Sequence, residues 1–382
     1  MQIVKSKEKD LSNIMEIIQH AQNYLADLNI DQWQNGYPNE ERILQDIAQN
    51  EAYLLKDKND RAMATAMFTT TTESTYTKIE GEWITDENTK YGVIHRMAVH
   101  NNFRKTGAAR FLFNYFENQL LEQGIYTMRI DTHEDNLGMQ KLLQRNGYLY
   151  CGVIYLEDGA KRLAFEKILV PPSIQTETTS TWNSLSEAYA DKFMGMSYYL
   201  ESYKSLVQLL PENAKILEIG CGPGNITKEI VKLLPKAEIL ATDVSSQTLI
   251  KAKEINPSIE TQVMDIRDCK QINSSFNALI CGFTLPYISP YEVSEFLKNA
   301  KSLLIENGFL YISFVPSEQY KSEVLGDDDK GRMIFHSHTT QFILNHAKKL
   351  NYEVSKAFTV NYPVSESKNE QHQIYILKSQ RN

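Results

Sequence analysis

Residues 216–227 constrain the fold of this chain more than any other stretch of its sequence. An apolar run, Ile-Leu-Glu-Ile, leads there directly into Gly220, Gly222 and Gly224, and a helical pattern follows. Glycine allows the backbone to approach a ligand where a Cβ atom would clash, and the first turn of a helix offers unpaired N–H groups. The stretch therefore predicts a strand, a tight turn and a helix that hold a ligand at the edge of an α/β sheet.

The spacing of these glycines argues against a dinucleotide site, whose loop carries the pattern G-x-G-x-x-G. Here the third glycine comes one position early, and Asn225 stands where the last glycine should be. Two acidic residues accompany the turn, because Glu218 lies in the apolar run and Asp243 ends the next one, at 238–243. A carboxylate at the end of a strand can accept two hydrogen bonds from a ribose diol, so the pattern favours a ligand that carries a ribose.

This arrangement resembles the first motifs of the class I S-adenosylmethionine-dependent methyltransferases. The resemblance covers residues 181–382 and implies an α/β domain with a Rossmann-like sheet of seven strands. It implies that Asp243 holds the ribose, that Asp265 and its apolar neighbours form the adenine pocket, and that residues 281–283 lie under the methionine end. The residues that it assigns to the cofactor are Tyr189, from a segment that covers the site, and Glu218, Gly220, Gly222, Asp243, Val244, Asp265, Ile266 and Cys281.

Methyl transfer needs little catalytic machinery, because the sulfonium already activates the methyl group and the enzyme mainly aligns a nucleophile and excludes water. The sequence therefore does not reveal the acceptor of the methyl group. Residues 316–338 look like an inserted, charged loop at the sheet edge where acceptors sit, and they contain Arg332, His336 and His338. Substrate specificity is expected to depend on this loop.

With 382 residues the chain is long enough for two domains. The composition changes at residues 170–180, where Pro171 and Pro172 precede a run rich in Thr and Ser. Paired prolines and such a run disfavour regular structure, so this stretch is predicted to be a linker. It separates a first domain, 1–169, from a second, 181–382, and each is expected to fold independently because each carries its own ligand-binding motifs.

The first domain contains a basic, glycine-containing loop at residues 104–109, between an apolar run at 93–99 and a helical pattern. The backbone N–H groups and the helix dipole at such a junction suit a pyrophosphate. A strand pattern at 127–131 follows, and then a helical pattern that begins at Asn136. This order resembles the GNAT acyl-CoA N-acyltransferases, and the resemblance covers residues 1–168 and implies a mixed sheet flanked by helices.

The GNAT resemblance implies acetyl-CoA as the acyl donor. In that family two neighbouring strands splay apart, and the pantetheine inserts between them as a pseudo-strand that bonds to the backbone. The residues that the resemblance assigns to acetyl-CoA are Met97, Ala98 and Val99 of the strand, Arg104, Lys105, Thr106, Gly107, Ala108 and Ala109 of the loop, and Asn136.

The usual acid of acetyl transfer is missing. Leu143 stands where many GNAT enzymes place a tyrosine that protonates the departing thiolate. Tyr148, Tyr126 or water would serve instead, or no enzyme acid is needed, because a thiol is a fair leaving group near neutral pH. At the level of sequence, the catalytic activity of this domain therefore stays open.

Acetylation of an amine also needs a base or a water relay, because the attacking nitrogen must be neutral. His95, in the apolar run 93–99, and Glu82 are the predicted catalytic residues, with His133 as a further candidate. A single histidine in a strand can equally serve as a structural hydrogen-bond donor.

The overall charge and the cysteines argue against several other classes of protein. The formal net charge is −8 and Lys and Arg are not clustered, which disfavours a nucleic-acid partner. The four cysteines lack the paired spacing of a metal site and are expected to be reduced, so no metal is predicted. The sequence shows neither a signal-peptide core nor an apolar run of membrane length, so the protein is expected to be cytoplasmic, without a membrane partner.

Together these patterns predict a bifunctional transferase that acetylates an amine and methylates a small molecule. One alternative is a methyltransferase whose GNAT-like domain binds CoA without turnover and acts as a sensor or scaffold. A second alternative is a methyltransferase that modifies protein or RNA, which a basic or peptide-sized groove would support. The sequence identifies neither acceptor, nor the oligomeric state, nor any coupling between the two sites.

Overall fold

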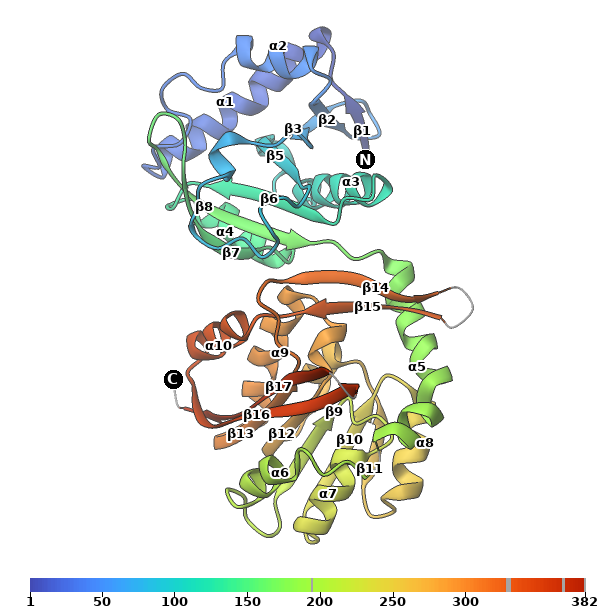
Figure 1. Cartoon of the computed structure of the whole chain (residues 1–382). Coiled ribbons are helices and arrows are strands. Elements are labelled where there is room, and N and C mark those ends of the chain that lie inside the picture. Colours follow the sequence, from blue (N-terminus) through green and yellow to red (C-terminus); the bar gives the residue numbers. More distant parts are fainter. Residues whose placement is uncertain (194, 328–330, 366–367, 381–382) are drawn as a thin grey trace. The chain divides into compact units, whose positions relative to one another are not determined.

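The computed structural model describes residues 1–193, 195–327, 331–365 and 368–380 (Figure 1). The chain divides into two compact units, Met1–Val170 and Pro171–Asn382. Each unit is built on a large β-sheet with helices packed against it, so the protein is of the α/β class, as predicted. Within the described residues, no helix is long and apolar enough to cross a membrane.

The first unit is built on a sheet of eight strands in the order β1-β2-β3-β5-β6-β8-β7-β4. Neighbouring strands are antiparallel except for β5 and β6, which run parallel, so the predicted mixed sheet is confirmed. The strands are β1 (Gln2–Lys5), β2 (Ala52–Lys56), β3 (Ala62–Thr69), β4 (Glu80–Gly81), β5 (Gly92–Val99), β6 (Thr127–Thr132), β7 (Leu149–Tyr155) and β8 (Lys161–Ile168), and the helices are α1 (Leu11–Asp27), α2 (Glu40–Ala48), α3 (Ala108–Glu122) and α4 (Leu137–Arg145).

The helices of this unit cover both faces of the sheet, because each presents apolar residues at helical spacing. Ile14, Ile17 and Ile18 of α1 are fully buried in one core cluster with residues of β2 and β5. Leu112 and Phe116 of α3 are fully buried in a second cluster on the other face. Burial of each such side chain stabilises the fold by roughly 1.5–3 kcal/mol and fixes the sheet that carries the first site.

The parallel strands β5 and β6 separate towards the carboxyl end of β5. Among the described residues, β5 and β6 pair at only two consecutive positions, Gly92 and Val93 of β5. Strand β5 continues to Val99 while it pairs with β3 on its other side. The edge of residues 97–99 that faces β6 is therefore open, as the predicted insertion of a pantetheine chain requires.

The second unit is built on a sheet of seven strands in the order β11-β10-β9-β12-β13-β17-β16. The first five run parallel, and β17 and β16 are antiparallel to their neighbours, which confirms the predicted Rossmann-like sheet of seven strands. The strands are β9 (Lys215–Ile219), β10 (Glu238–Asp243), β11 (Glu260–Val263), β12 (Phe276–Gly282), β13 (Leu304–Phe314), β16 (Tyr352–Ser365) and β17 (Lys368–Ser379), and the helices are α5 (Pro172–Phe193), α6 (Leu200–Val207), α7 (Asn225–Leu233), α8 (Ser246–Ile255), α9 (Pro290–Leu303) and α10 (Thr340–Lys349).

Helices cover both faces of the seven-stranded sheet. Side chains of α6, α7 and α8 share one core cluster with the strands, and side chains of α9 and α10 share another (Figure 1). Because the five parallel strands all end at one edge, the loops after β9, β10, β11 and β12 meet there. This edge carries the second site.

The inserted stretch 316–338, predicted to be a loop, contains regular structure instead. It forms an antiparallel hairpin of β14 (Lys321–Asp327) and β15 (Gly331–Ser337), which is a separate sheet of two strands. Helix α5 packs along β15. The stretch is therefore a hairpin that packs against α5, and not the solvated loop that was predicted.

The predicted linker at 170–180 is also wrong, because α5 begins at Pro172. Proline is tolerated at the first position of a helix, where its missing N–H would have had no partner. Contacts with the hairpin then hold the helix: the Thr181 hydroxyl donates to the carbonyl of Arg332 at 2.8 Å, and the Thr178 hydroxyl accepts an N–H of β15 at 3.1 Å. These tertiary contacts override the weak local preference of a Thr-rich run.

Candidate functional site

The turn between β9 and α7 has the geometry of the predicted ligand-binding loop. Gly220, Gly222 and Gly224 all lie in the left-handed region, with φ values of +69°, +54° and +84°. A Cβ atom on Gly220 would overlap the hydroxyl of Thr284 and lie 2.7 Å from its Cγ2 atom. The turn passes so close to the chain after β12 that a side chain at Gly220 does not fit.

Asp243, the last residue of β10, lies against this turn. Its Oδ2 accepts the N–H of Gly222 at 2.9 Å, and its Oδ1 accepts the N–H of Ser245 at 2.8 Å. Burial raises the pKa of Asp243, although these hydrogen bonds oppose the effect by stabilising the charged form. Thr248 and the backbone of Val244 also favour the charged form, and Asp243 lines the cavity, where a carboxylate can accept hydrogen bonds from a ligand.

Glu218 lies within β9 and is 1% exposed. Its Oε2 accepts the hydroxyl of Thr227 in α7 at 2.6 Å, whereas its Oε1 is buried and lacks a hydrogen-bond partner among the described residues. Burial raises the pKa of Glu218 to about 8, with a smaller contribution from the charge of Asp243. At neutral pH the Glu218 side chain is therefore mostly protonated, and it joins β9 to the helix that follows the turn.

Replacing Glu218 with glutamine is expected to stabilise the second unit at alkaline pH. A carboxyl whose pKa is raised by folding contributes stability while it is protonated, and this contribution is lost as the pH rises from 4.5 to about 8. Glutamine keeps an oxygen for Thr227 and does not ionise. Thermal unfolding from about pH 6 to about pH 9 should show a steeper loss of stability in the wild type than in E218Q. Parallel curves for the two proteins would contradict the assignment.

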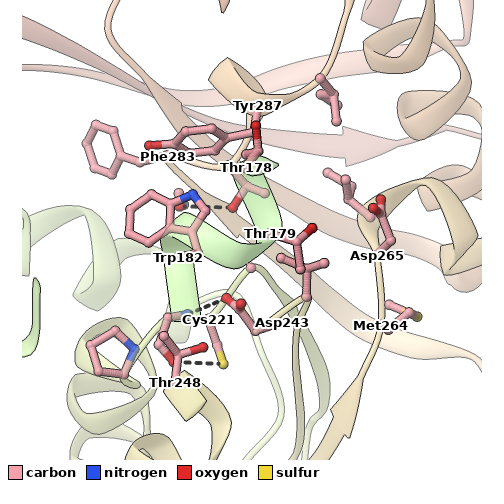
Figure 2. Close-up of a pocket in the computed structure, with 18 of the residues that line it drawn as sticks. Thr178, Thr179, Trp182, Cys221, Asp243, Thr248, Met264, Asp265, Phe283 and Tyr287 are labelled. Atoms are coloured by element: carbon pink, nitrogen blue, oxygen red, sulfur yellow. Dashed lines mark hydrogen bonds between the residues drawn. The ribbon is translucent and has the colours of Figure 1, made fainter. Parts of the chain in front are cut away.

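A cavity with an empty volume of about 1000 Å³, part of it open to solvent, lies at this edge of the sheet (Figure 2). Its floor is formed by the loops after β9, β10, β11 and β12. The predicted residues that line it are Gly220, Gly222, Asp243, Val244, Asp265 and Ile266, and they are joined by Thr178, Thr179, Trp182, Phe283, Thr284, Tyr287 and Ile334.

In the first unit, the predicted phosphate loop lies between β5 and α3. Gly107 directly precedes the helix with a φ of +87°, and a Cβ atom on it would meet no described atom within 4 Å. Lys105 also has a positive φ, of +62°, and the guanidinium of Arg104 lies 3.9 Å from the centroid of the Tyr24 ring. The loop thus turns sharply into the N-terminus of α3 and leaves open space in front of Gly107, where helix N–H groups suit an anion.

His95 lies in β5 and pairs with Glu73, a residue that the sequence analysis did not select. The His95 Nε2 and Glu73 Oε1 atoms are 3.2 Å apart, and the two side chains are partly exposed. The hydrogen bond from His95 lowers the pKa of Glu73, although partial burial opposes the effect. Glu73 therefore stays ionised at neutral pH and favours the tautomer of His95 with its proton on Nε2, which leaves a lone pair on Nδ1.

Comparison with known proteins identifies both units. The Acetyltransferase (GNAT) family model matches residues 22–148, and the Methyltransferase domain model matches residues 216–308. A GNAT-family acetyltransferase from Streptococcus agalactiae shares 34% identity over 44% of this chain and 96% of that chain, with a TM-score of 0.41. The chain therefore contains a GNAT acetyltransferase domain at residues 22–148 and a class I S-adenosylmethionine-dependent methyltransferase domain at residues 216–308.

The curated relatives of the methyltransferase domain match over only part of their own length. A putative methyltransferase, 235L, of Invertebrate iridescent virus 6 is 31% identical over 34% of this chain and 49% of its own length. Trans-aconitate 2-methyltransferase of Variovorax paradoxus is 29% identical over 22% of this chain and 32% of its own length. This chain thus spans about half or less of these relatives, so the matches define the domain and not its acceptor.

Asp265 lines the cavity of the methyltransferase domain, but Arg267 already engages its carboxylate. The Nη1 of Arg267 lies 3.0 and 2.9 Å from the two oxygens of Asp265, and its Nε donates to Glu292 at 2.5 Å. The ion pair fixes the orientation of Asp265 and compensates its charge. The backbone N–H of Arg267 also donates to Oδ1 of Asp265, at 2.9 Å, so the negative charge of Asp265 is compensated. A role of Asp265 in holding an adenine amine stays a prediction.

Glu218 and Cys281 were predicted to contact the cofactor but are absent from the lining of the cavity. Cys281 is fully buried in the core between β12 and α9, and this burial raises the pKa of its thiol to about 12. Successive side chains of a strand point to opposite faces, and the lining begins only at Gly282 and Phe283, where β12 ends. The side chain of Tyr189 lies outside the described residues, so its role stays a prediction.

Thr178, Thr179 and Trp182 of α5 close the methyltransferase cavity. The two threonines come from the stretch that was predicted to be a linker, whereas Trp182 lies at the start of the segment that the family resemblance places over the site. Figure 2 shows the Trp182 ring beside Tyr287 and Phe283, and the rings of Trp182 and Tyr287 meet edge to face with centroids 5.3 Å apart. The aromatic residues that begin at Trp182 were the one sequence signal for this closure, and they are equally typical of core packing.

Asn136 of the GNAT domain acts as a helix cap. Its side-chain oxygen accepts the N–H of Met139 at 3.1 Å, and its amide donates to Gln32 at 3.0 Å. This contact ties the loop after α1 to the start of α4. A role of Asn136 in binding acetyl-CoA stays a prediction.

The structure does not bring Glu82 to His95. Glu82 is exposed, and its N–H bonds to the carbonyl of Cys151 in β7, which β6 and β8 separate from β5. Glu73, which precedes a short helical turn after β3, takes the place beside His95 instead. The spacing of Glu73 and His95 in the sequence gave no signal of this pair.

The candidates for the acid of acetyl transfer differ in burial. Leu143 is fully buried in the core, and Tyr148 is 1% exposed, with its hydroxyl donating to Glu117 at 3.1 Å. Burial raises the pKa of Tyr148 well above its ordinary value, so it is unsuited to protonate a departing thiolate. Tyr126 is 49% exposed, so water or Tyr126 is left for this step.

Among the described residues, Glu16, His20 and His100 have potential metal-ligand atoms within 4.8 Å of one another. The Nδ1 of His100 accepts the N–H of Asn102 at 3.1 Å, so the proton of the neutral ring lies on Nε2, which faces Glu16 at 3.4 Å. Hydrogen bonds thus use both ring nitrogens of His100, and we assign no metal to this group.

Proposed function

We propose that the chain is a bifunctional transferase, which transfers an acetyl group from acetyl-CoA to an amine and a methyl group from S-adenosylmethionine to a small molecule. One observation carries this proposal: in each domain, a glycine with left-handed backbone angles lies between a strand and the helix that follows it. These glycines are Gly107 before α3 and Gly224 before α7. Such junctions offer N–H groups to nucleotide cofactors. The net charge of −8 supports small acceptors rather than nucleic acid.

The cavity of the methyltransferase domain fits S-adenosylmethionine in its chemistry, because apolar walls surround a few polar groups at the edge of the sheet. Asp243 would accept the ribose hydroxyls, Ile266 would flank the adenine, and the glycine turn at Gly220 and Gly222 would lie against the amino-acid end. The bound molecule supplies an activated methyl group, while Trp182 and Tyr287 help to exclude water.

The opening beside β5 fits acetyl-CoA. The edge of residues 97–99 that faces β6 offers backbone groups to a pantetheine chain, and the loop around Gly107 offers the N-terminus of α3 to a pyrophosphate. The bound molecule supplies an acetyl thioester. His95 takes a proton from the amine through Nδ1, while Glu73 orients the ring and stabilises the imidazolium that forms.

Replacing Gly107 with aspartate is expected to weaken CoA binding at least about tenfold, because a negative charge then faces the pyrophosphate. A side chain there meets no described atom within 4 Å, so folding costs only the left-handed backbone, about 1–2 kcal/mol, which the alanine control shares. Calorimetry with CoA measures the effect, and Gly107→Ala, which adds the Cβ atom without the charge, is the matched control. Wild-type affinity in folded G107D would refute the assignment of this loop.

Replacing His95 with glutamine is expected to reduce kcat for acetyl transfer by roughly 10²- to 10⁴-fold without changing CoA affinity. Glu73→Gln should act in the same direction but more weakly, because it removes only the group that orients His95. Thiol release from acetyl-CoA in a screen of amines provides the assay. Glu82→Gln is the control, since Glu82 lies beside β7, and an equal loss in that variant would speak against the His95–Glu73 pair.

The sensor alternative is favoured by one specific observation, the buried Leu143 at the position of the usual acid. If the GNAT domain is a sensor, it should bind CoA, and no amine in the screen should release the thiol from acetyl-CoA. Saturable CoA binding together with thiol release for at least one amine supports the catalytic function instead.

A further inference from the structure

Three aromatic side chains gather on one side of the cavity of the methyltransferase domain. Trp182 belongs to α5, Phe283 directly follows β12, and Tyr287 ends the short helical turn Leu285–Tyr287. All three line the cavity, and Figure 2 shows their rings gathered above the carboxylate of Asp243. Helix α5 and the short turn lie outside the strand ends that carry the proposed cofactor residues, so this side of the cavity is available to the methyl acceptor.

Contacts between rings hold these aromatic side chains in place. The rings of Trp182 and Tyr287 meet edge to face with centroids 5.3 Å apart, and Tyr287 meets Phe335 of β15 edge to face at 6.0 Å. Ile288 and Ile334 add aliphatic side chains to the lining. Because edge-to-face contacts fix the orientation of each ring, this side of the cavity is preorganised for a flat apolar molecule.

Arg267 supplies a positive charge to the lining, and two carboxylates neutralise it. Among the described residues, the charged side chains of the lining are Asp243, Asp265 and Arg267. The Nη1 of Arg267 lies 3.0 and 2.9 Å from the two oxygens of Asp265, and its Nε donates to Glu292 at 2.5 Å. Its Nη2 donates to the carbonyl of Tyr287 at 3.2 Å. Since every nitrogen of the guanidinium is engaged, an acidic acceptor would meet carboxylates and, among these side chains, no unpaired cation.

The histidines at the end of the hairpin do not supply a cation either. His336 and His338 are 1% and 2% exposed. Burial lowers the pKa of His336 to about 3 and the pKa of His338 to about 4, so both rings are neutral at neutral pH. Arg332 of β15 forms an ion pair with Glu177 of α5, at 2.7 and 2.8 Å, and does not line the cavity. The described charges on this side of the cavity therefore favour a neutral acceptor.

We propose that the methyl acceptor is a planar aromatic molecule without carboxylate or phosphate groups, which binds against Trp182 and Tyr287. This inference names the substrate class of the proposed methyltransferase function and rests on that function. The rings bury the flat surface of the acceptor, whereas the neutralised Arg267 gives an acid nothing in exchange for its lost hydration. Selectivity against acids therefore depends on the pairing of Arg267 with Asp265 and Glu292.

Calorimetry of the full chain saturated with S-adenosylhomocysteine tests the proposal with three probes at neutral pH. Naphthol is planar and neutral, naphthoate carries a carboxylate at the same ring position, and decahydronaphthol keeps the hydroxyl but lacks the aromatic rings. Naphthol should bind at least about tenfold more tightly than naphthoate and roughly threefold more tightly than decahydronaphthol. Equal affinities for naphthol and either of the other two probes would overturn the proposal.

Replacing Glu292 with glutamine tests the role of the paired Arg267. Glutamine keeps an oxygen for the N–H of Ser289, which Glu292 accepts at 2.7 Å, but removes one of the two charges that neutralise the guanidinium. The affinity for naphthoate relative to naphthol should therefore rise at least about threefold. Glu295→Gln is the matched control, because Glu295 of α9 lies outside the lining and pairs with Lys298 at 3.6 Å. An unchanged ratio in folded E292Q would contradict the proposal.

Replacing Trp182 with leucine locates the site at which the probes bind. Leucine keeps an apolar side chain but removes the ring, so the affinity for naphthol should fall at least about fivefold, and by more than the affinity for S-adenosylhomocysteine. Tyr198→Leu is the control, since Tyr198 is 49% exposed outside the lining, and it should bind naphthol as the wild type does. Wild-type affinity for naphthol in folded W182L would refute the proposed site.

Calorimetry with S-adenosylhomocysteine alone separates the possible failures. If the chain binds S-adenosylhomocysteine but not naphthol, the aromatic side chains only cover the cofactor, and the inference is wrong while the methyltransferase function stands. If S-adenosylhomocysteine does not bind, the proposed function fails and the inference fails with it.

Discussion

Replacing Asp243 with alanine is expected to weaken binding of S-adenosylhomocysteine by about 1.5–3 kcal/mol, or between about tenfold and about 150-fold. The carboxylate lines the cavity at the end of β10, where we propose that it accepts the ribose hydroxyls. It also accepts the N–H groups of Gly222 and Ser245, so its loss loosens the glycine turn as well. Calorimetry measures the change.

The control for this variant is Asp268→Ala. Asp268 is exposed on the short helical segment after β11, and its carboxylate bonds to Gln271 outside the cavity. It should bind S-adenosylhomocysteine as the wild type does. Equal affinities for D243A and the wild type would refute the ribose assignment.

Replacing Gly220 with alanine is expected to destabilise the methyltransferase domain by about 2–5 kcal/mol and to abolish binding of S-adenosylhomocysteine. A left-handed backbone costs an alanine about 1–2 kcal/mol, and the overlap of its Cβ atom with Thr284 adds about 1–3 kcal/mol. Thermal or denaturant unfolding gives the stability, and Thr284→Ala in the same chain should restore part of it, because the overlapping atoms are gone while the backbone cost stays.

Gly124 provides the matched control for Gly220. Its φ of +70° is almost the same as that of Gly220, but a Cβ atom there would meet no described atom within 4 Å. Gly124→Ala should therefore cost its own domain only the backbone part, about 1–2 kcal/mol. If the two variants destabilise their domains equally, the close approach at Gly220 does not matter.

The sequence predicted those parts of the sites that local chemistry dictates. Gly220, Gly222 and Gly107 could be found because left-handed turns between a strand and a helix favour glycine, and Asp243 because it ends a parallel strand next to such a turn. The order of the motifs then indicated both sheets. These features depend on neighbours in the sequence, which is why they could be predicted.

The parts that escaped prediction depend on contacts between distant residues. Glu73 meets His95 only because the segment after β3 folds back over β5, and the linker became α5 only because β15 accepts its Thr residues. Cys281 was predicted to contact the cofactor but is buried in the core, because successive side chains of a strand point to opposite faces of the sheet. One consequence concerns fragments, since a second domain that begins near Thr178 would lose the first turns of α5, and it should begin at Pro171. Whether each fragment folds alone stays a prediction.

The most direct test of the two-site account is a crossed titration of the full chain and two variants. Calorimetry with CoA and with S-adenosylhomocysteine should give one saturable site for each ligand in the wild type. Gly107→Asp should lose affinity for CoA alone, and Asp243→Ala should lose affinity for S-adenosylhomocysteine alone. A wild-type chain that fails to bind one of the ligands, or a folded variant that loses the ligand of the other domain, would contradict the account.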